Sequence, residues 1–424
     1  MKKSWWLLIL SCLAVVLVGC NDEKDKEKAD DSNGFIGNWQ GELQIPNEQL
    51  AFELKLAESS GSLSVPAQNA KDIPFLSVKY DGDVFEAKLL IDSKEIIFNG
   101  KLDGERIEGT YTEGVVDYPF YLNRGEIEDV EDETTTDIPV ENGVLKTYLQ
   151  LPEDEGPHPL MIIIAGSGPT DRDGNTVGAS GKNNSYKLLA EELAQEGIAT
   201  LRYDKRGIGE NMALAPSEIA LTFDSYINDA TAIIEAMKKD ERFSKVGVIG
   251  HSEGSLIGMY AAKKAQTDSF ISLAGAGRPI DEVLKEQLKG QLPPTLQKES
   301  DDILAQLKEG KLVNQVSPAL NSLYRPSVQP YMISWLALNP VEAIATLEMP
   351  TLIVQGTTDL QVKIEDAHAL KAANAEAELA LIDKMNHVLK EAPQDQTANM
   401  ATYVNPDLPL APGLTEKIVK FIKG

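Results

Sequence analysis

The sequence predicts an α/β protein whose main domain is a doubly wound, mostly parallel sheet with an inserted helical cap, preceded by a small antiparallel β-domain. Two observations lead to this prediction. In residues 138–424, wholly apolar runs alternate with helical patterns, and such runs are what strands buried on both faces of a parallel sheet require. In residues 35–124, short runs of alternating apolar and polar residues are separated by turn dipeptides.

The first 19 residues are typical of a signal peptide, because two lysines precede an apolar run over residues 5–18. The segment 17–20, Leu-Val-Gly-Cys, resembles a bacterial lipobox. This resemblance implies cleavage before Cys20, lipidation of Cys20 and an extracytoplasmic protein anchored to a membrane by that lipid. The alternatives are an ordinary cleaved signal or a short anchor helix, and the run is short for a spanning helix.

The cysteine content argues against an internal disulfide, and the net charge argues against a nucleic-acid partner. The two cysteines are Cys12 and Cys20, so removal of the signal leaves one cysteine and no possible disulfide within the chain. The formal net charge of −26 repels phosphate backbones, so we expect no nucleic-acid partner. Residues 20–34 are nearly all polar or charged and read as a tether that the lipid holds.

The β-domain is expected over residues 35–124, where Asp81-Gly82, Asn99-Gly100 and Asp103-Gly104 are predicted as hairpin turns. Trp39 opens a strand there and is expected in the core of this domain rather than at a ligand. The acidic segment 125–137 then suits a linker.

The main domain, residues 138–424, contains six apolar segments that read as parallel strands. They lie at residues 160–165, 199–203, 246–249, 270–274, 351–355 and 378–382. Between about 279 and 348 helical patterns run without a strand, which indicates an inserted cap. Apolar residues of this cap are expected to roof an acyl pocket: Leu288, Tyr331, Trp335 and Leu336.

A catalytic serine is predicted in Gly250-His251-Ser252-Glu253-Gly254, which follows a strand and precedes a helical segment. This is the setting of a nucleophile elbow. The turn is so sharp that Gly250 and Gly254 crowd each other, and the strained backbone lifts Ser252 clear of the sheet.

The serine needs an imidazole base, and the chain has four histidines. His158 precedes a strand, His251 sits inside the elbow and His368 lies within a helical stretch. His387 follows the last strand, at the carboxyl end where such sheets place their ligands, and is therefore the predicted base.

The third member of the triad should be a carboxylate that orients the imidazole. Asp359 follows the preceding strand, and the chain order Ser252, Asp359, His387 is that of α/β-hydrolases. Asp383 competes with Asp359, although a carboxylate so close to His387 in one loop more often caps that loop.

The oxyanion of an acyl-transfer intermediate needs two amide donors. The first is predicted to be the amide of Glu253, whose side chain is then incidental. The second should come from the loop Gly166-Ser167-Gly168-Pro169, with Ser167 preferred and Gly168 next. A phosphate cradle is the other interpretation of this loop, but its glycine spacing fits no such motif and no Walker lysine is present.

Residues from about 138 to 424 resemble bacterial α/β-hydrolases of the serine-esterase and serine-aminopeptidase type. The segments that carry the resemblance are 165–173, 202–207, 250–254 and 356–359. The sequence departs from this family at Ala165, where many relatives have histidine. Charged residues flanking the site are interpreted as loop charge pairs rather than substrate ligands: Asp171, Arg172, Asp204 and Arg206. The front domain similarly resembles a β-module that precedes some of these hydrolases, through residues 35–41 and 109–114.

The sequence thus predicts a serine hydrolase that cleaves small carboxylic esters of short to medium acyl length through an acyl-enzyme, and needs neither cofactor nor metal. A serine peptidase of the same fold remains the alternative, and Asp171 and Asp173 are candidates to hold a free amino terminus. A surface binding lipoprotein with an inactive hydrolase domain is the third reading. The intact Ser252, Asp359 and His387 argue against it.

Overall fold

The computed structural model describes residues 34–424, except 46–47, 58–59, 66–69, 92–93, 115, 125–133, 177–180 and 216. The predicted signal peptide and Cys20 therefore lie outside the described residues. The chain forms two compact units that divide after residue 131. In the part of the chain that the structure describes, no helix combines the length and the apolar character needed to cross a bilayer.

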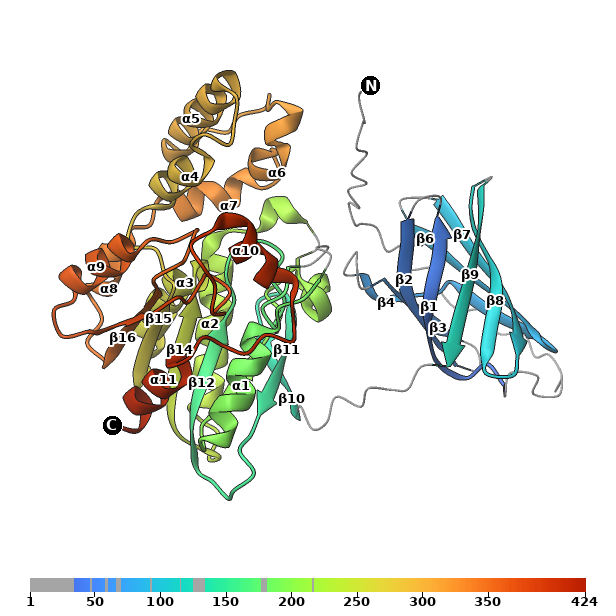
Figure 1. The fold of residues 1–424 in the computed structure, drawn as a ribbon, viewed down its shortest axis with the longest axis horizontal. Coiled ribbons are helices and arrows are strands. Elements are labelled where there is room, and N and C mark those ends of the chain that lie inside the picture. The colour runs from blue at the N-terminus through green and yellow to red at the C-terminus, as the bar shows by residue number, and fades with distance from the viewer. Residues whose placement is uncertain are drawn as a thin grey trace. The chain divides into compact units, whose positions relative to one another are not determined.

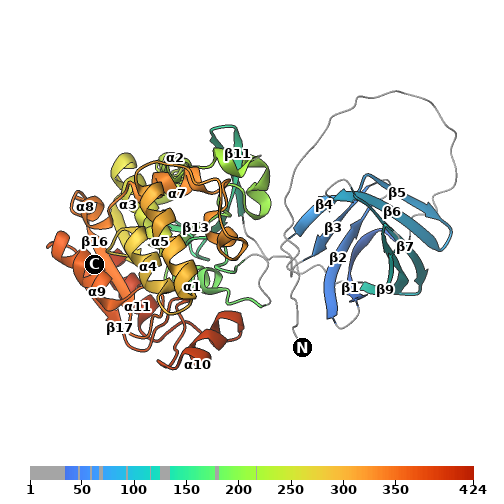
Figure 2. The same cartoon turned by 90° about the horizontal axis from the view of Figure 1, so that it is seen from above.

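The first unit is a curved antiparallel sheet (Figure 2). Its described residues form nine strands in the order β4-β3-β2-β1-β9-β8-β7-β6-β5. The strands are β1 (Gly37–Ile45), β2 (Glu48–Leu56), β3 (Gly61–Val65), β4 (Ala70–Pro74), β5 (Ser77–Asp81), β6 (Val84–Ile91), β7 (Lys94–Asp103), β8 (Arg106–Glu113) and β9 (Val116–Arg124). One face of this sheet buries a core rich in aromatic residues, in which Trp39 is fully buried and its Nε1–H donates to the carbonyl of Phe35 at 2.7 Å.

One predicted turn of this unit is wrong. Asp81-Gly82 and Asp103-Gly104 lie at hairpin turns, but Asn99-Gly100 lies inside β7, where Gly100 pairs with Phe85. A Cβ atom at residue 100 would lie 2.3 Å from the ring of Phe85. The glycine therefore makes room for an aromatic ring and does not turn the chain.

The second unit contains a mixed sheet with helices on both faces (Figure 1). Its described strands follow the order β10-β11-β13-β12-β14-β15-β16-β17. The strands are β10 (Thr134–Val140), β11 (Gly143–Gln150), β12 (His158–Ile164), β13 (Ala199–Arg202), β14 (Phe243–His251), β15 (Ser269–Leu273), β16 (Thr351–Gly356) and β17 (Glu378–Ile382). The strands from β13 to β17 are parallel, whereas β10 and β11 form an antiparallel edge.

The predicted apolar segments form the six parallel strands, with ends displaced by up to three residues. Strands β10 and β11 had no counterpart in the prediction. Strand β10 begins at Thr134 and pairs with β11. It therefore takes up the last four residues of the segment predicted as linker. Its alternating pattern with one buried position, Ile138, is that of an edge strand rather than of a central one.

Successive side chains of each central strand enter two different cores. In β12, Ile162 and Ile164 face a core formed with α2 (Phe223–Met237), α3 (Glu253–Ala265) and α9 (Ile364–Ala373). Met161 and Ile163 face the opposite core, formed with α1 (Ser185–Gln195) and α11 (Leu414–Lys423). Wholly apolar strands are therefore required because both faces of the sheet are covered.

The cap is inserted between β15 and β16 and has a small core of its own. Its helices are α4 (Ile280–Leu288), α5 (Pro294–Lys308), α6 (Asn321–Tyr324) and α7 (Gln329–Leu336), with the short 3-10 helix η4 (Pro318–Leu320). Helix α8 (Pro340–Ile344) lies inside the predicted cap range, but Ile344 packs in the core of the main sheet. Figure 1 shows α4, α5 and α6 as a group beyond one end of that sheet.

The remaining short helices lie in connections of the second unit. They are η2 (Gly209–Leu214), η3 (Glu218–Ala220), α10 (Gln396–Ala401) and η5 (Thr402–Val404).

Candidate active site

The nucleophile elbow joins β14 to α3. Ser252 is the single residue between the strand and the helix, and its φ of 54° and ψ of −119° lie in a region that non-glycine residues rarely adopt. A Cβ atom at Gly250 would lie 2.3 Å from the carbonyl oxygen of Gly254, and one at Gly254 would lie 2.2 Å from that of Ile164. Both positions thus require glycine: Gly250 because it crowds Gly254, as predicted, and Gly254 because it lies against the backbone of β12.

Three predicted side chains meet at the carboxyl edge of the sheet. His387 Nε2 lies 3.1 Å from Ser252 Oγ, and His387 Nδ1 lies 2.8 Å from Asp359 Oδ2. Because the carboxylate can only accept, the ring donates through Nδ1–H and leaves Nε2 free to accept the serine proton. Asp359 and His387 are 6% and 5% exposed, so this chain of hydrogen bonds is shielded from water.

The carboxylate of Asp359 is held in its charged form. Burial raises its pKa, but His387 and the amides of Gln361 and Val362 outweigh this effect and lower the pKa below its ordinary value. These amides donate to Oδ1 at 2.8 and 3.0 Å, so Oδ2 faces the imidazole. Asp383, the competing carboxylate, is exposed and accepts a hydrogen bond from the hydroxyl of Thr357 at 3.3 Å instead.

The other three histidines occupy different positions. His158 begins β12 and contacts the carbonyl of Asp154, and His368 is exposed on α9. His251, at the end of β14, is buried against the ring of His387 with a centroid separation of 4.8 Å. Only His387 contacts Ser252 among the four, all of which the structure describes.

A relay of hydrogen bonds surrounds His251. Its Nε2 lies 2.9 Å from the carbonyl oxygen of His387, so Nε2 carries the proton and Nδ1 accepts. The hydroxyl of Tyr186 then donates to Nδ1 at 2.7 Å and accepts from the amide of Gly166 at 3.2 Å. Burial, together with the charge of His387, lowers the pKa of His251 to about 3, which keeps the ring neutral. The relay therefore links the backbone of the base to the predicted oxyanion loop.

The predicted oxyanion donors lie on two sides of the elbow. Glu253 is the first residue of α3, so its amide has no acceptor within the helix and belongs to the positive end of the helix dipole. Ser167 and Gly168 follow β12, and their carbonyls accept from the hydroxyl and the amide of Thr170 at 2.8 and 2.9 Å. Both arms thus lie where β12 and α3 approach each other through Gly254.

The side chain of Glu253 is not incidental, contrary to the prediction. It is 5% exposed and pairs with the ammonium of Lys205 at 3.1 Å. Burial raises the pKa of Tyr331 on α7 well above its ordinary value, and the charge and side-chain hydrogen bond of Glu253 add to this rise. The prediction missed this contact because only the tertiary fold brings β13, α3 and the cap together.

The flanking charges form pairs within the protein, as interpreted from the sequence. The guanidinium of Arg172 donates to Asp204 at 3.2 Å and that of Arg206 to Asp229 at 2.9 Å. Asp171 stands apart, because its carboxylate accepts the amides of Asp173 and Asn175 at 2.9 and 2.8 Å. Its burial raises its pKa to about 6.

Two residues next to the site were missed by the sequence analysis. Tyr186 was not among the candidate residues, and Lys205 appeared only as part of the 202–207 segment. A lysine shortly after a buried strand was the one signal that could have indicated Lys205, since lysine is rarely fully buried without a partner.

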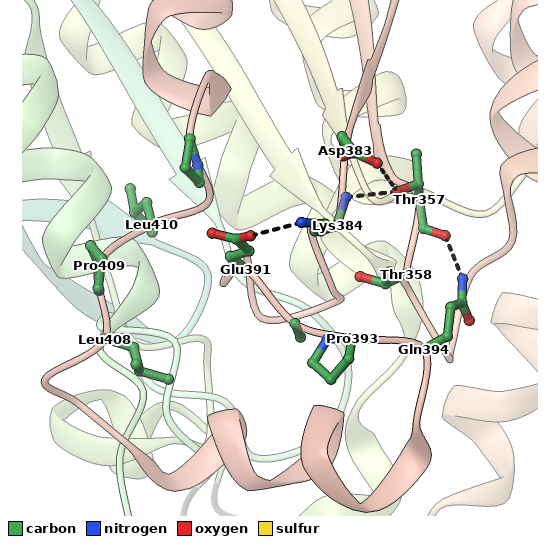
Figure 3. A pocket seen from close by; sticks show the side chains of 12 residues that line it. Thr357, Thr358, Asp383, Lys384, Glu391, Pro393, Gln394, Leu408, Pro409 and Leu410 are labelled. Atoms are coloured by element: carbon green, nitrogen blue, oxygen red, sulfur yellow. Dashed lines mark hydrogen bonds and ion pairs between the residues drawn. The ribbon is translucent and has the colours of Figure 1, made fainter.

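A pocket of about 760 Å³ lies beside the loops that carry Asp359 and His387 (Figure 3). Thr357 and Thr358 line it, and Figure 3 shows Thr357 hydrogen-bonded to Asp383, to the amide of Lys384 and to Gln394. None of the three side chains that meet at Ser252 lines this pocket. Within the described residues, no group of three or more histidine, cysteine, aspartate or glutamate side chains is arranged to hold a metal ion.

Comparison with known proteins places this geometry in a family. A model of the family described as serine aminopeptidase, S33, matches residues 177–393. The chain is 26% identical over 365 residues to Esterase EstD of Thermotoga maritima, covering 83% of this chain and 84% of the relative. A 124-residue stretch is 31% identical to 2,6-dihydropseudooxynicotine hydrolase of Paenarthrobacter nicotinovorans, 28% of each protein.

Among solved structures, Est1E of Butyrivibrio proteoclasticus with bound ferulic acid is 19% identical. It covers 68% of this chain and 100% of its own, with a TM-score of 0.47. The family match spans just over half of the 424 residues and includes the elbow and all three side chains that meet there. The chain therefore belongs to the serine aminopeptidase S33 family of α/β-hydrolases.

Proposed function

We propose that this protein is a serine hydrolase that cleaves carboxylic esters of short to medium acyl length through Ser252, His387 and Asp359. His387 Nε2 removes the proton of Ser252 as Oγ attacks the ester carbonyl, and Asp359 stabilises the imidazolium. The amides of Glu253 and Ser167, or Gly168 in place of Ser167, stabilise the oxyanion. The imidazolium then protonates the departing alkoxide, and water hydrolyses the acyl-enzyme by the reverse sequence.

The observation that carries the proposal is the continuous hydrogen-bonded chain from Ser252 Oγ through His387 to Asp359, with separations of 3.1 and 2.8 Å. A serine alcohol is a weak nucleophile without such a base. The positive φ of Ser252 adds to this argument, since a strained residue at a strand-to-helix turn exposes its hydroxyl at the edge of the sheet.

The charges near the site favour an ester over a peptide with a free amino terminus. Such a substrate needs an unpaired carboxylate to hold its ammonium group. Asp173 pairs with Arg202, Asp204 with Arg172, and Glu253 with Lys205. Asp171 is engaged by backbone amides, and burial raises its pKa toward neutrality, so it is a poor partner for an ammonium group.

The chemistry of the leaving group points the same way. An alkoxide leaves with less protonation than an amine needs, so an ester is cleaved by the triad and oxyanion donors alone. The similarity to an enzyme named as an esterase along 83% of the chain agrees with this reading.

The cap is proposed to set the acyl preference. Leu336 is buried in the cap's own core, whereas Tyr331 and Trp335 are partly buried and pack against Phe223 of the main domain with centroid distances of 5.9 and 5.5 Å. These aromatic side chains, with the half-buried Leu288, remain the candidates for apolar contact with an acyl chain. A hydrophobic pocket discriminates by about 1–3 kcal/mol per methylene, which is enough to set an optimum length.

The location of the enzyme is a second part of the proposal. The lipobox-like segment before Cys20 supports an extracytoplasmic protein that a diacylated Cys20 holds on a membrane, since two acyl chains anchor stably where one does not.

The deciding experiment combines active-site labelling with a substrate panel. A fluorophosphonate probe should label the wild type but not Ser252→Ala. Ser255→Ala is the control and should be labelled, because the Ser255 hydroxyl is hydrogen-bonded to that of Ser272 at 2.8 Å and has no proposed catalytic role. Ser252→Ala and His387→Ala should each lose about as much activity as the double variant, because the three residues act as a unit. Asp359→Asn should lose less, and His368→Ala should behave as wild type.

The substrate panel separates the two candidate activities. We expect kcat/KM to pass through a maximum across p-nitrophenyl esters of increasing chain length and to exceed that for aminoacyl and prolyl nitroanilides. Strong nitroanilide cleavage with a flat, weak ester series would make the enzyme a peptidase. Failure of the wild type to react with the probe would instead support a binding protein without catalysis.

A further inference from the structure

A buried lysine connects the two arms of the proposed oxyanion hole. Lys205 follows β13 and is 2% exposed. Its Nζ donates to the carbonyl oxygen of Gly166 at 2.5 Å and to Glu253 Oε1 at 3.1 Å. Gly166 precedes Ser167, one predicted donor, and Glu253 is the other. One ammonium group thus contacts both segments from which the oxyanion donors come.

Stability alone is a weak reason for this ion pair. Moving an ammonium and a carboxylate out of water costs much of what their attraction returns, and a well-packed apolar pair is often at least as stable. Part of the remaining surface of the ammonium faces the ring of Tyr226, with Nζ 5.1 Å from the ring centroid. Lys205 is therefore well satisfied, but its position beside the elbow calls for a role beyond packing.

The geometry of a peptide unit shows what that role is. The Gly166–Ser167 peptide is trans, so its C=O and N–H point in opposite directions. Fixing the Gly166 oxygen on Lys205 therefore fixes the direction of the Ser167 amide, which points away from Lys205. A charged donor on the carbonyl also polarises the peptide, which strengthens the N–H as a donor.

The other peptide of Gly166 is fixed from a different side. Its amide donates to the hydroxyl of Tyr186 at 3.2 Å. The loop is thus held by its N–H on one side and its C=O on the other, and only the second contact carries a full charge.

We infer that Lys205 is a positioning residue of the oxyanion hole, which orients the Ser167 amide through the Gly166 carbonyl and ties it to Glu253. This inference rests on the proposed serine mechanism but not on the choice of ester, because every acyl substrate of Ser252 passes through the same oxyanion. Lys205 touches neither the substrate nor the reacting atoms. It acts on the transition state and not on the bound ester.

The test replaces Lys205 with methionine, which is of similar length and carries no charge. We expect Lys205→Met to lower kcat about 10- to 100-fold, since removal of a whole oxyanion donor costs about 100- to 1000-fold. KM should change less than about twofold. The affinity for a trifluoromethyl ketone, which forms the tetrahedral adduct, should fall in parallel with kcat, whereas that for a non-reactive competing amide should not.

Two further variants separate the two contacts of Lys205. Glu253→Gln keeps the bond between Lys205 and the Gly166 carbonyl, so its kcat should fall less than that of Lys205→Met. The double variant Lys205→Met/Glu253→Gln removes the unpaired carboxylate that the single change leaves buried, and its kcat should stay as low. If Lys205→Met fails to fold, the double variant carries the test.

The control disrupts a neighbouring buried ion pair. Arg206→Met/Asp229→Asn removes an ion pair in which the nitrogen and oxygen lie 2.5 Å apart, and should lower stability without lowering kcat. Wild-type kcat in Lys205→Met, or recovery of kcat in the double variant, would overturn the inference. A wild type that neither reacts with the fluorophosphonate probe nor turns over any acyl substrate would overturn the proposed function instead.

Discussion

Removal of the Tyr186 hydroxyl should uncouple the base from the oxyanion loop. Tyr186 donates to His251 Nδ1 at 2.7 Å and accepts from the amide of Gly166 at 3.2 Å. Tyr186→Phe keeps the ring, which is 3% exposed and packs against Leu189 and Leu193 in one core of the sheet. The change therefore removes two hydrogen bonds and little else.

The expected loss of stability follows from the two groups left behind. The Gly166 amide and His251 Nδ1 are both buried and lose their partner, and a buried unsatisfied polar group costs about 1–3 kcal/mol. Tyr186→Phe should thus lower the free energy of unfolding of the catalytic unit by about 2–6 kcal/mol. His251 cannot escape by taking a second proton, because its burial and the charge of His387 lower its pKa to about 3.

Urea unfolding followed by helical circular dichroism measures this loss, since every helix in the described residues lies in the second unit. Tyr324→Phe is the matched control: its hydroxyl is equally buried but bonds only Ser300, at 2.8 Å, so it should lose about 1–2 kcal/mol and keep its activity. We expect kcat of Tyr186→Phe to fall as well. If Tyr186→Phe were no less stable than Tyr324→Phe and fully active, the relay would have no energetic role.

Three further predictions concern other parts of the chain. Burial raises the Asp171 pKa from 3.8 to about 6, so this group stabilises the fold below pH 4 and loses that contribution, at most about 3 kcal/mol, as the pH rises through 6. Urea unfolding of Asp171→Asn should therefore show an advantage over wild type that grows between pH 4 and pH 8, and a constant difference would contradict this. Gly254→Ala should lose activity and about 3 kcal/mol of stability, because its Cβ would lie 2.2 Å from the carbonyl oxygen of Ile164 in a central strand. A variant whose midpoint of urea unfolding equals that of the wild type would refute this prediction. Cys20→Ser should shift the protein from the membrane fraction to the soluble fraction. An unmodified Cys20 in mass spectrometry of the wild type would contradict the proposed lipid anchor.

The parallel strands could be predicted because burial on both faces leaves a clear mark on the sequence. Strand β12 sends Ile162 to one core and Ile163 to the other, so every position is apolar. The same reasoning overlooked the antiparallel edge strands β10 and β11, whose exposed positions interrupt the apolar pattern. It also wrongly predicted a turn at Asn99-Gly100. The sequence does not distinguish a glycine that makes room for the Phe85 ring from a glycine that turns the chain.

The candidate triad could be chosen from sequence because its members follow local rules. Gly250 and Gly254 mark the elbow, and Asp359 and His387 each follow a strand whose carboxyl end lies at the same edge of the sheet. Because the chain has only four histidines, only three other candidates for the catalytic base had to be excluded. Position along each strand was therefore enough to choose these residues.

The sequence by itself determined the six parallel strands, the net acidic charge, the elbow and the choice of Ser252, Asp359 and His387 as candidates, because each depends on composition or on neighbours close along the chain. Only the tertiary structure decided that Lys205 meets Glu253 and that Tyr186 meets His251. These pairs join residues 48 and 65 positions apart. No local pattern records such contacts, because the packing of the sheet, its helices and the cap brings the partners together.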